Sequence, residues 1–225
     1  MPPPEPTDIG IWVCDFEKET LTPCLFMLAA CPVSNVRAES VPWRGPDRPP
    51  KPFRGSETAS LLHGVGGSGP PPHHCHLHFF GPMMVPGFPL TSRLTNWEFP
   101  VAMGGIVVLL DKRIEETWGH RVLRRIRPPN NPTLTWVKAQ RLPFLIAGMG
   151  YEPGSPEIES LLTRYGLTSD TQLVCGPLPE KELVRGRDML GGLLPEVFKP
   201  GRVSFDQIYA QRIVRAAREL VEHAR

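Results

Sequence analysis

The amino-acid sequence predicts an α/β protein with a doubly wound, mostly parallel sheet, and three observations lead to that prediction. From about residue 101 onward, short apolar runs alternate with segments of helical periodicity. The apolar runs are rich in β-branched residues and lack polar alternation, which is typical of strands covered by helices on both faces. Hydrophobic residues make up 40% of the 225-residue chain and charged residues 21%, so we expect a packed core.

The first hundred residues give fewer signals. Asp8–Cys14 is expected to be the opening strand, and Leu25–Ala30 a helix that ends at Pro32. Residues 38–72 contain clusters of proline and glycine with little apolar periodicity, and we interpret them as a long, irregular, flexible loop. Alternation resumes at His74–Phe80, which predicts a strand.

The second half of the chain has clearer boundaries. Ser155 and Pro156 are suited to the start of a helix, and Gly166 to its end. The elements expected here are strands at Gly104–Leu110, Pro143–Ala147 and Thr171–Cys175, and helices at Ile114–Ile126, Thr133–Arg141, Pro156–Tyr165, Glu180–Val197 and Ser204–His223. In the terminal helix we expect one apolar face to dock on the domain, made of Ile208, Ile213, Ala217, Leu220 and Val221.

Charge and cysteine usage narrow the class of protein. The 25 basic residues nearly match the 23 acidic ones, so a nucleic-acid partner is not expected. The five cysteines are odd in number and widely spaced, which favours reduced thiols over a disulfide framework. No apolar run is long enough to span a membrane and the first residues do not resemble a signal peptide, so we expect a cytoplasmic protein.

Phosphate-binding motifs are missing where a doubly wound fold would place them. The loop after the first strand reads CDFEKETLTP, without glycine, and Asp15, Glu17 and Glu19 would repel a phosphate. No G-x-x-x-x-G-K-[ST] or G-x-G-x-x-G motif opens a helix after a strand.

An ordered series of segments nevertheless resembles a known family, the bacterial Ras-like small GTPases of the MglA type. The segments are LHFFGP at Leu77–Pro82, GGIVVLLD at Gly104–Asp111, RLPFLIAGMGYE at Arg141–Glu152, SPEIESLLTRYGL at Ser155–Leu167 and QLVCGP at Gln172–Pro177. Thr22–Ser40 is similar to the family's first helix and the segment after it. The resemblance implies a Ras-like domain at residues 11–198, with a flexible N-terminus at 1–10 and a C-terminal helix within 199–225.

The resemblance also implies which positions would meet a nucleotide. They are Thr22, which has a hydroxyl suited to magnesium, and the position-matched residues Gly81, Glu152, Cys175 and Gly176. Several groups that the family needs are replaced. Leu21 stands at the lysine of the phosphate loop, Met84 at a glycine that meets the terminal phosphate, and Val85 at the glutamine that orients water. The guanine-reading NKxD pattern becomes Met149, Gly150, Tyr151 and Glu152.

These departures predict a pseudo-GTPase that acts as a protein-interaction or regulatory module, with no catalytic residues and no expected cofactor. Its expected partner is a protein, and the family implies small roadblock-type regulators in polarity or motility signalling. The alternative is a functional GTP-binding protein that uses GTP or GDP with magnesium through divergent motifs, in which case it would be a GTP hydrolase.

A second alternative is zinc binding through the His73–His78 cluster. On a strand, His74, His76 and His78 would share one face with neighbours about 6.6 Å apart, so two of them could reach one ion. The competing interpretation is an edge strand with a polar outer face. Two further residues also have two interpretations: Asp111 as a catalytic acid or a helix cap, and Cys175 as a nucleophile or a buried structural thiol.

Overall fold

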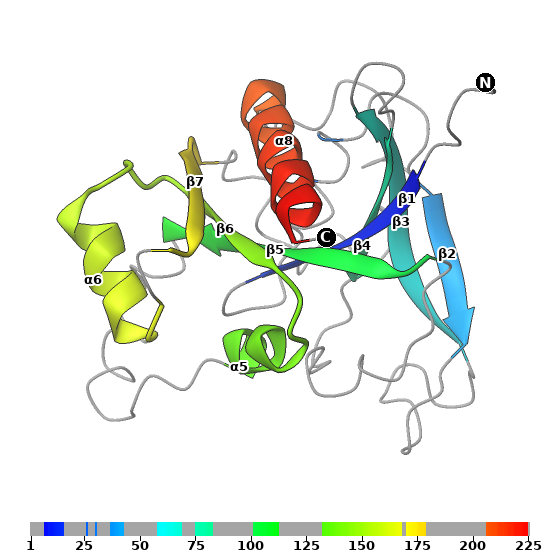
Figure 1. Ribbon diagram of the computed structural model, residues 1–225, viewed down its shortest axis with the longest axis horizontal. Coiled ribbons are helices and arrows are strands. Elements are labelled where there is room, and N and C mark those ends of the chain that lie inside the picture. Colours follow the sequence, from blue (N-terminus) through cyan, green and yellow to red (C-terminus); the bar gives the residue numbers. More distant parts are fainter. Residues whose placement is uncertain are drawn as a thin grey trace, which may run out of the picture.

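A computed structural model contains a seven-stranded mixed sheet in the order β2-β3-β4-β1-β5-β6-β7 (Figure 1). The described residues are 7–15, 26, 30, 37–42, 58–68, 75–82, 101–112, 132–167, 170–178 and 206–224. The strands are β1 (Thr7–Asp15), β2 (Arg37–Pro42), β3 (Thr58–Ser68), β4 (Cys75–Pro82), β5 (Met103–Asp111), β6 (Phe144–Met149) and β7 (Gln172–Gly176). The helices are α5 (Pro132–Ala139), α6 (Pro156–Arg164) and α8 (Gln207–His223).

The sheet is mostly parallel, as the apolar runs predict. Strands β4, β1, β5, β6 and β7 all run in the same direction, and β3 is antiparallel to β4. The edge strand β2 is in turn antiparallel to β3. The α/β class and the parallel core of the sheet are therefore confirmed.

The interpretation of residues 38–72 as an irregular loop is wrong where the structure describes them. Strand β3 has eleven residues and pairs with β4, with Gly64 opposite Phe79 and Gly66 opposite Leu77. Glycine is depleted in strands, so the tract GVGGS looks like a loop in sequence. In the fold, Gly66 packs near the Phe79 ring, and a Cβ added to it would make an ordinary contact with that ring at 3.5 Å.

Two hydrophobic layers cover the two faces of the sheet. Odd-numbered side chains of β1, such as Ile11, pack with α8, Phe26 and Phe79. Even-numbered ones, such as Trp12, belong to a second cluster that includes residues of α5 and α6. Figure 1 shows α8 and α5 on opposite sides of the strands. Helices on both faces explain why β5 is a continuous apolar run, with every residue from Gly105 to Asp111 buried.

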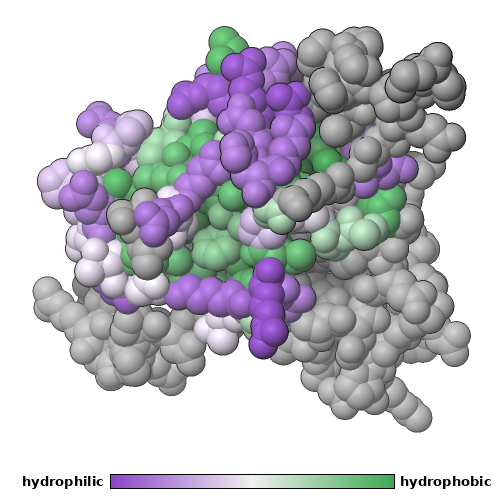
Figure 2. Space-filling view, viewed as in Figure 1, coloured by the Kyte–Doolittle hydropathy of each residue, from purple (hydrophilic) through white to green (hydrophobic). Residues whose placement is uncertain are grey.

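The terminal helix docks on the sheet as expected, but its buried face is rotated from the predicted one. Ile213, Ala217 and Val221 are buried, whereas Ile208 is 73% exposed and Tyr209 takes its place in the core. At 100° per residue, Ile208 lies 140° from Ile213 around the helix, while Tyr209 lies only 40° from it. Figure 2 shows hydrophilic side chains along the outer surface of α8 and hydrophobic ones over the strands beneath it.

Most remaining elements agree with the sequence prediction within a few residues. Helix α6 begins after Ser155 and ends at a glycine of positive φ, Gly166, although the Ser155 side chain makes no capping hydrogen bond. Phe26 and Ala30 are helical and buried, in agreement with the expected first helix. The expected helices at 114–126 and 180–197 lie outside the described residues. None of the described helices is long and apolar enough to cross a membrane.

Candidate functional site

The strand order places a topological switch point beside β1. From β1 the chain builds β2, β3 and β4 on one side, and then crosses to β5 on the other side. In doubly wound sheets, ligands bind in the crevice that this reversal creates at the carboxyl ends of the strands. The candidate site is therefore the edge where β1 ends at Asp15, β5 at Asp111, β6 at Met149 and β7 at Gly176.

At the end of β5, an acidic and a basic residue follow one another. Asp111 is only 2% exposed and is directly followed by Lys112, which is helical, so Asp111 occupies the position before a helix that the capping interpretation requires. The Lys112 ammonium forms an ion pair with Glu157 of α6 and lies 5.7 Å from the centre of the Tyr151 ring. The positive charge of Lys112 is thus paired with Glu157 and lies near the Tyr151 ring.

The loop after β6 is tied to the end of β7. The Gly150 N–H donates to the Gly176 carbonyl at 2.7 Å, and Gly150 has a φ of +81°. A Cβ on Gly150 would lie 2.6–3.1 Å from carbon atoms of the Leu178 side chain. Leu178, which is 41% exposed, therefore lies against Gly150, and a longer side chain at position 150 would require the end of the Leu178 side chain to move.

Within this loop, Tyr151 is buried and Glu152 is exposed. Met149, at the end of β6, is fully buried in the cluster that contacts α8. At the segment that the resemblance matches to the NKxD pattern, Glu152 thus exposes its carboxylate to solvent, and the thioether of Met149 is buried. A thioether is only a weak hydrogen-bond acceptor and has no donor.

Helix α8 packs over the end of β7 through Tyr209. A Cβ on Gly176 would lie 2.3–2.5 Å from atoms of the Tyr209 ring, so only glycine fits beneath it. The Tyr209 hydroxyl donates to the Val174 carbonyl at 2.9 Å. Burial, and next the nearby Cys175, raise the pKa of the Tyr209 phenol above its ordinary value, and Arg212 opposes this rise.

Cys175 has the properties of a structural thiol. Its side chain is buried in the cluster that includes α6 residues, and burial raises the pKa of the thiol above its ordinary value, with Arg212 opposing the rise. A nucleophilic cysteine requires a lowered pKa. The arrangement therefore favours the structural interpretation over the nucleophile.

The position-matched residues lie at different places in the sheet. Cys175 and Gly176 of β7 pair with Gly148 and Met149 of β6, and Glu152 follows three residues after Met149. Gly81 lies near the end of β4, opposite Leu62 of β3, four strand spacings from β7, or roughly 19 Å. Thr22, and with it Leu21, Met84 and Val85, lies outside the described residues.

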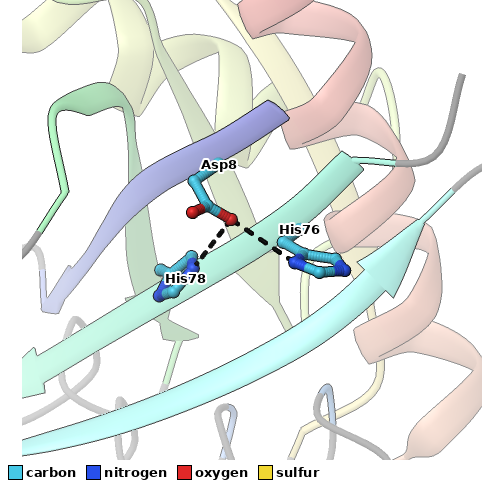
Figure 3. Close-up of polar contacts among 3 residues, drawn as sticks. All are labelled: Asp8, His76 and His78. Atoms are coloured by element: carbon cyan, nitrogen blue, oxygen red, sulfur yellow. Dashed lines mark hydrogen bonds and ion pairs between the residues drawn. The ribbon is translucent and has the colours of Figure 1, made fainter. Parts of the chain in front are cut away.

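Two of the three histidines expected on one face are described, and both face Asp8 of β1. The Asp8 Oδ1 atom lies 3.4 Å from the His76 Nδ1 atom and 3.3 Å from the His78 Nε2 atom (Figure 3). The shared face of His76 and His78 is thus as predicted, and His74 lies outside the described residues. The expectation of an edge strand is wrong, because β4 pairs with β3 on one side and with β1 on the other. Within the described ranges, no three His, Cys, Asp or Glu side chains are placed to hold a metal ion.

Sequence reasoning missed three residues that shape these sites: Asp8, Leu178 and Tyr209. Asp8 meets the histidines because β1 and β4 pair in parallel with Asp8 opposite His76, a long-range register without a local signal. For Tyr209 a signal exists, because it is a bulky residue four positions before Ile213 on an amphipathic helix. No protein-family model matches the chain, and a search of curated proteins finds no significant relative.

Proposed function

We propose that the chain is a Ras-like domain that has lost the hydrolytic cycle and works as a protein-interaction or regulatory module. The order β3-β4-β1-β5-β6-β7, with β3 antiparallel to five parallel strands, supports this proposal because it places β1 and its loop beside the switch point. The phosphate-contacting segment of the resemblance then ends β4, beside β1, and the guanine-reading segment ends β6, two strands beyond β1 on the other side.

The observation that carries the proposal is the packing of the Leu178 side chain against Gly150. In the family this position belongs to the lysine of the NKxD pattern. Here a glycine of positive φ is tied to Gly176, and an apolar side chain of the protein itself lies against it. A loop whose glycine packs against an apolar side chain of the protein itself supports a module that does not depend on nucleotide.

Acidic residues near the carboxyl ends of β1 and β5 also support the loss of nucleotide binding. Strand β1 ends at Asp15, and the sequence that follows it contains Glu17 and Glu19 and no glycine before Thr22. Asp111 adds an acidic residue at the end of β5, next to β1 in the sheet. Phosphate binding uses converging backbone N–H groups and a lysine, and negative charges in their place oppose it.

The direct test is nucleotide binding by the purified chain with magnesium present. We expect no binding of fluorescent GTP or GDP at micromolar concentration, and no release of phosphate from GTP. Micromolar affinity for GTP or GDP would contradict the pseudo-GTPase proposal. The alternative, a functional GTP-binding protein, predicts thermal stabilisation by GTP that disappears in Glu152→Ala and in Thr22→Ala.

The partner is tested separately, because a module without a nucleotide cycle must bind its partner in one state. A purified small roadblock-type regulator is expected to bind the chain with the same affinity in the presence and absence of GTP and magnesium. Binding that requires GTP would favour the functional GTPase. If the regulator does not bind at all, this partner is excluded, and the proposal that the chain does not hydrolyse GTP is unaffected.

A further inference from the structure

The first turn of α8 holds the end of β7 through one residue. The Asp206 carboxylate accepts a hydrogen bond from the Tyr209 backbone N–H at 2.8 Å and so fixes the start of the helix. The Tyr209 hydroxyl donates to the Val174 carbonyl at 2.9 Å, and its ring covers Gly176. Tyr209 thus contacts two alternate residues of β7, one by a polar and one by an apolar contact.

The end of β7 in turn holds the loop that follows β6. The Gly176 carbonyl accepts the Gly150 N–H at 2.7 Å, and Leu178, two residues further on, lies against Gly150. At the far end of this loop the Ser155 N–H donates to the Glu152 carbonyl at 3.2 Å, just before α6 begins. The conformation of the loop is therefore fixed at both ends, and Gly176 provides one of the two fixed points.

We propose that Tyr209 is a positioning residue, through which the first turn of α8 sets the conformation of the loop from Gly150 to Glu152. The path runs from the Tyr209 ring to Gly176 and from the Gly176 carbonyl to Gly150. This role goes beyond the proposed function, because it concerns the presentation of Glu152 whether or not a nucleotide binds. Displacing the first turn of α8 would remove the Tyr209 ring from Gly176 and so weaken the hydrogen bond between the Gly176 carbonyl and the Gly150 N–H.

Hydrogen exchange of individual backbone amides in the full-length chain tests the proposal by NMR. Tyr209→Ala removes both contacts and is expected to speed exchange of the Gly150 amide about tenfold. Tyr209→Phe keeps the ring over Gly176 and is expected to leave the Gly150 amide close to the wild-type rate. This rescue by the conservative variant separates positioning by the ring from any effect of the hydroxyl.

A matched control comes from the other end of the same helix. Val221 packs against Gly104 and Gly105 of β5, far along α8 from Tyr209. Val221→Ala weakens the docking of α8 without touching Gly176, so faster exchange is expected at the start of β5 and not selectively at Gly150.

If Tyr209→Ala does not fold, Asp206→Ala gives a milder loosening of the first turn while the core side chains stay in place. It is expected to speed exchange at Gly150 a fewfold. An unchanged Gly150 amide in the folded variants would overturn the proposal. The same pattern of exchange in the Tyr209 and Val221 variants would also overturn it, because that would indicate general destabilisation. Neither result bears on nucleotide binding, so the two proposals fail independently.

Discussion

Replacing Gly176 by alanine tests the tightest contact in the candidate site. The added Cβ would lie 2.3–2.5 Å from atoms of the Tyr209 ring, a distance that requires the ring to move. Overpacking of a core costs about 1–3 kcal/mol, and displacing the ring breaks the bond from its hydroxyl to the Val174 carbonyl, which adds about 1 kcal/mol. We therefore expect Gly176→Ala to lower the free energy of unfolding by about 2–4 kcal/mol.

Urea denaturation followed by circular dichroism measures this loss, and thermal denaturation should show a fall of about 4–16 °C. Gly154→Ala is the matched control, because Gly154 has a φ of +70° and no atom within 4 Å of its added Cβ. Its cost of about 1 kcal/mol comes from backbone conformation alone. Gly176 has the opposite combination, since its backbone is ordinary for a strand and its surroundings are crowded.

A double-mutant cycle shows whether the cost comes from the Tyr209 ring. In a Tyr209→Ala background the space above Gly176 is open, so adding Gly176→Ala should cost less than about 1 kcal/mol. The reasoning would be refuted by a Gly176→Ala variant as stable as the wild type, or by an equal cost in both backgrounds.

Three further predictions follow from burial and charge. Burial raises the pKa of the Cys175 thiol above its ordinary value of 9.0, so its contribution to stability is present below pH 9 and is lost as the pH rises further. Between pH 8 and pH 10 the free energy of unfolding, measured by urea denaturation, should therefore fall more for the wild type than for Cys175→Ala. Equal falls in the two proteins would contradict this. Asp8→Ala should cost less than about 1 kcal/mol because Asp8 and its two histidine partners are partly exposed, and a loss of several kcal/mol on urea denaturation would show a stronger network. Ile208→Ala should change the free energy of unfolding by less than about 0.5 kcal/mol, because the Ile208 side chain is 73% exposed. Ile213→Ala should cost about 2–5 kcal/mol, because the Ile213 side chain is fully buried. Thermal denaturation of the two variants checks the orientation of α8, and similar losses of stability would contradict it.

The parts of the fold that could be predicted from sequence are those with a local cause. Strand β5 is recognisable because helices cover both faces and every residue near its centre must be apolar. Helix α6 is recognisable because Pro156 suits a first turn and Gly166 suits the positive φ that ends it.

Strand β3 and its pairing could not be found in the same way. Its glycines are unfavourable for a strand by themselves, and the strand is formed through its long-range antiparallel pairing with β4, which has no local signal. The same limit applies to the pairing of Asp8 with His76 and His78, which depends on the parallel register between two strands about 70 residues apart.

In the candidate site, too, some features could be predicted from the sequence and others depend on tertiary contacts. Sequence by itself determined the α/β class and the acidic, glycine-free segment after β1, because these are properties of residue type and order. Only the tertiary structure decided that Leu178 lies against Gly150 and that Tyr209, instead of Ile208, docks over Gly176. The physical reason is that these contacts join segments whose side chains acquire neighbours only when the sheet and α8 are packed together.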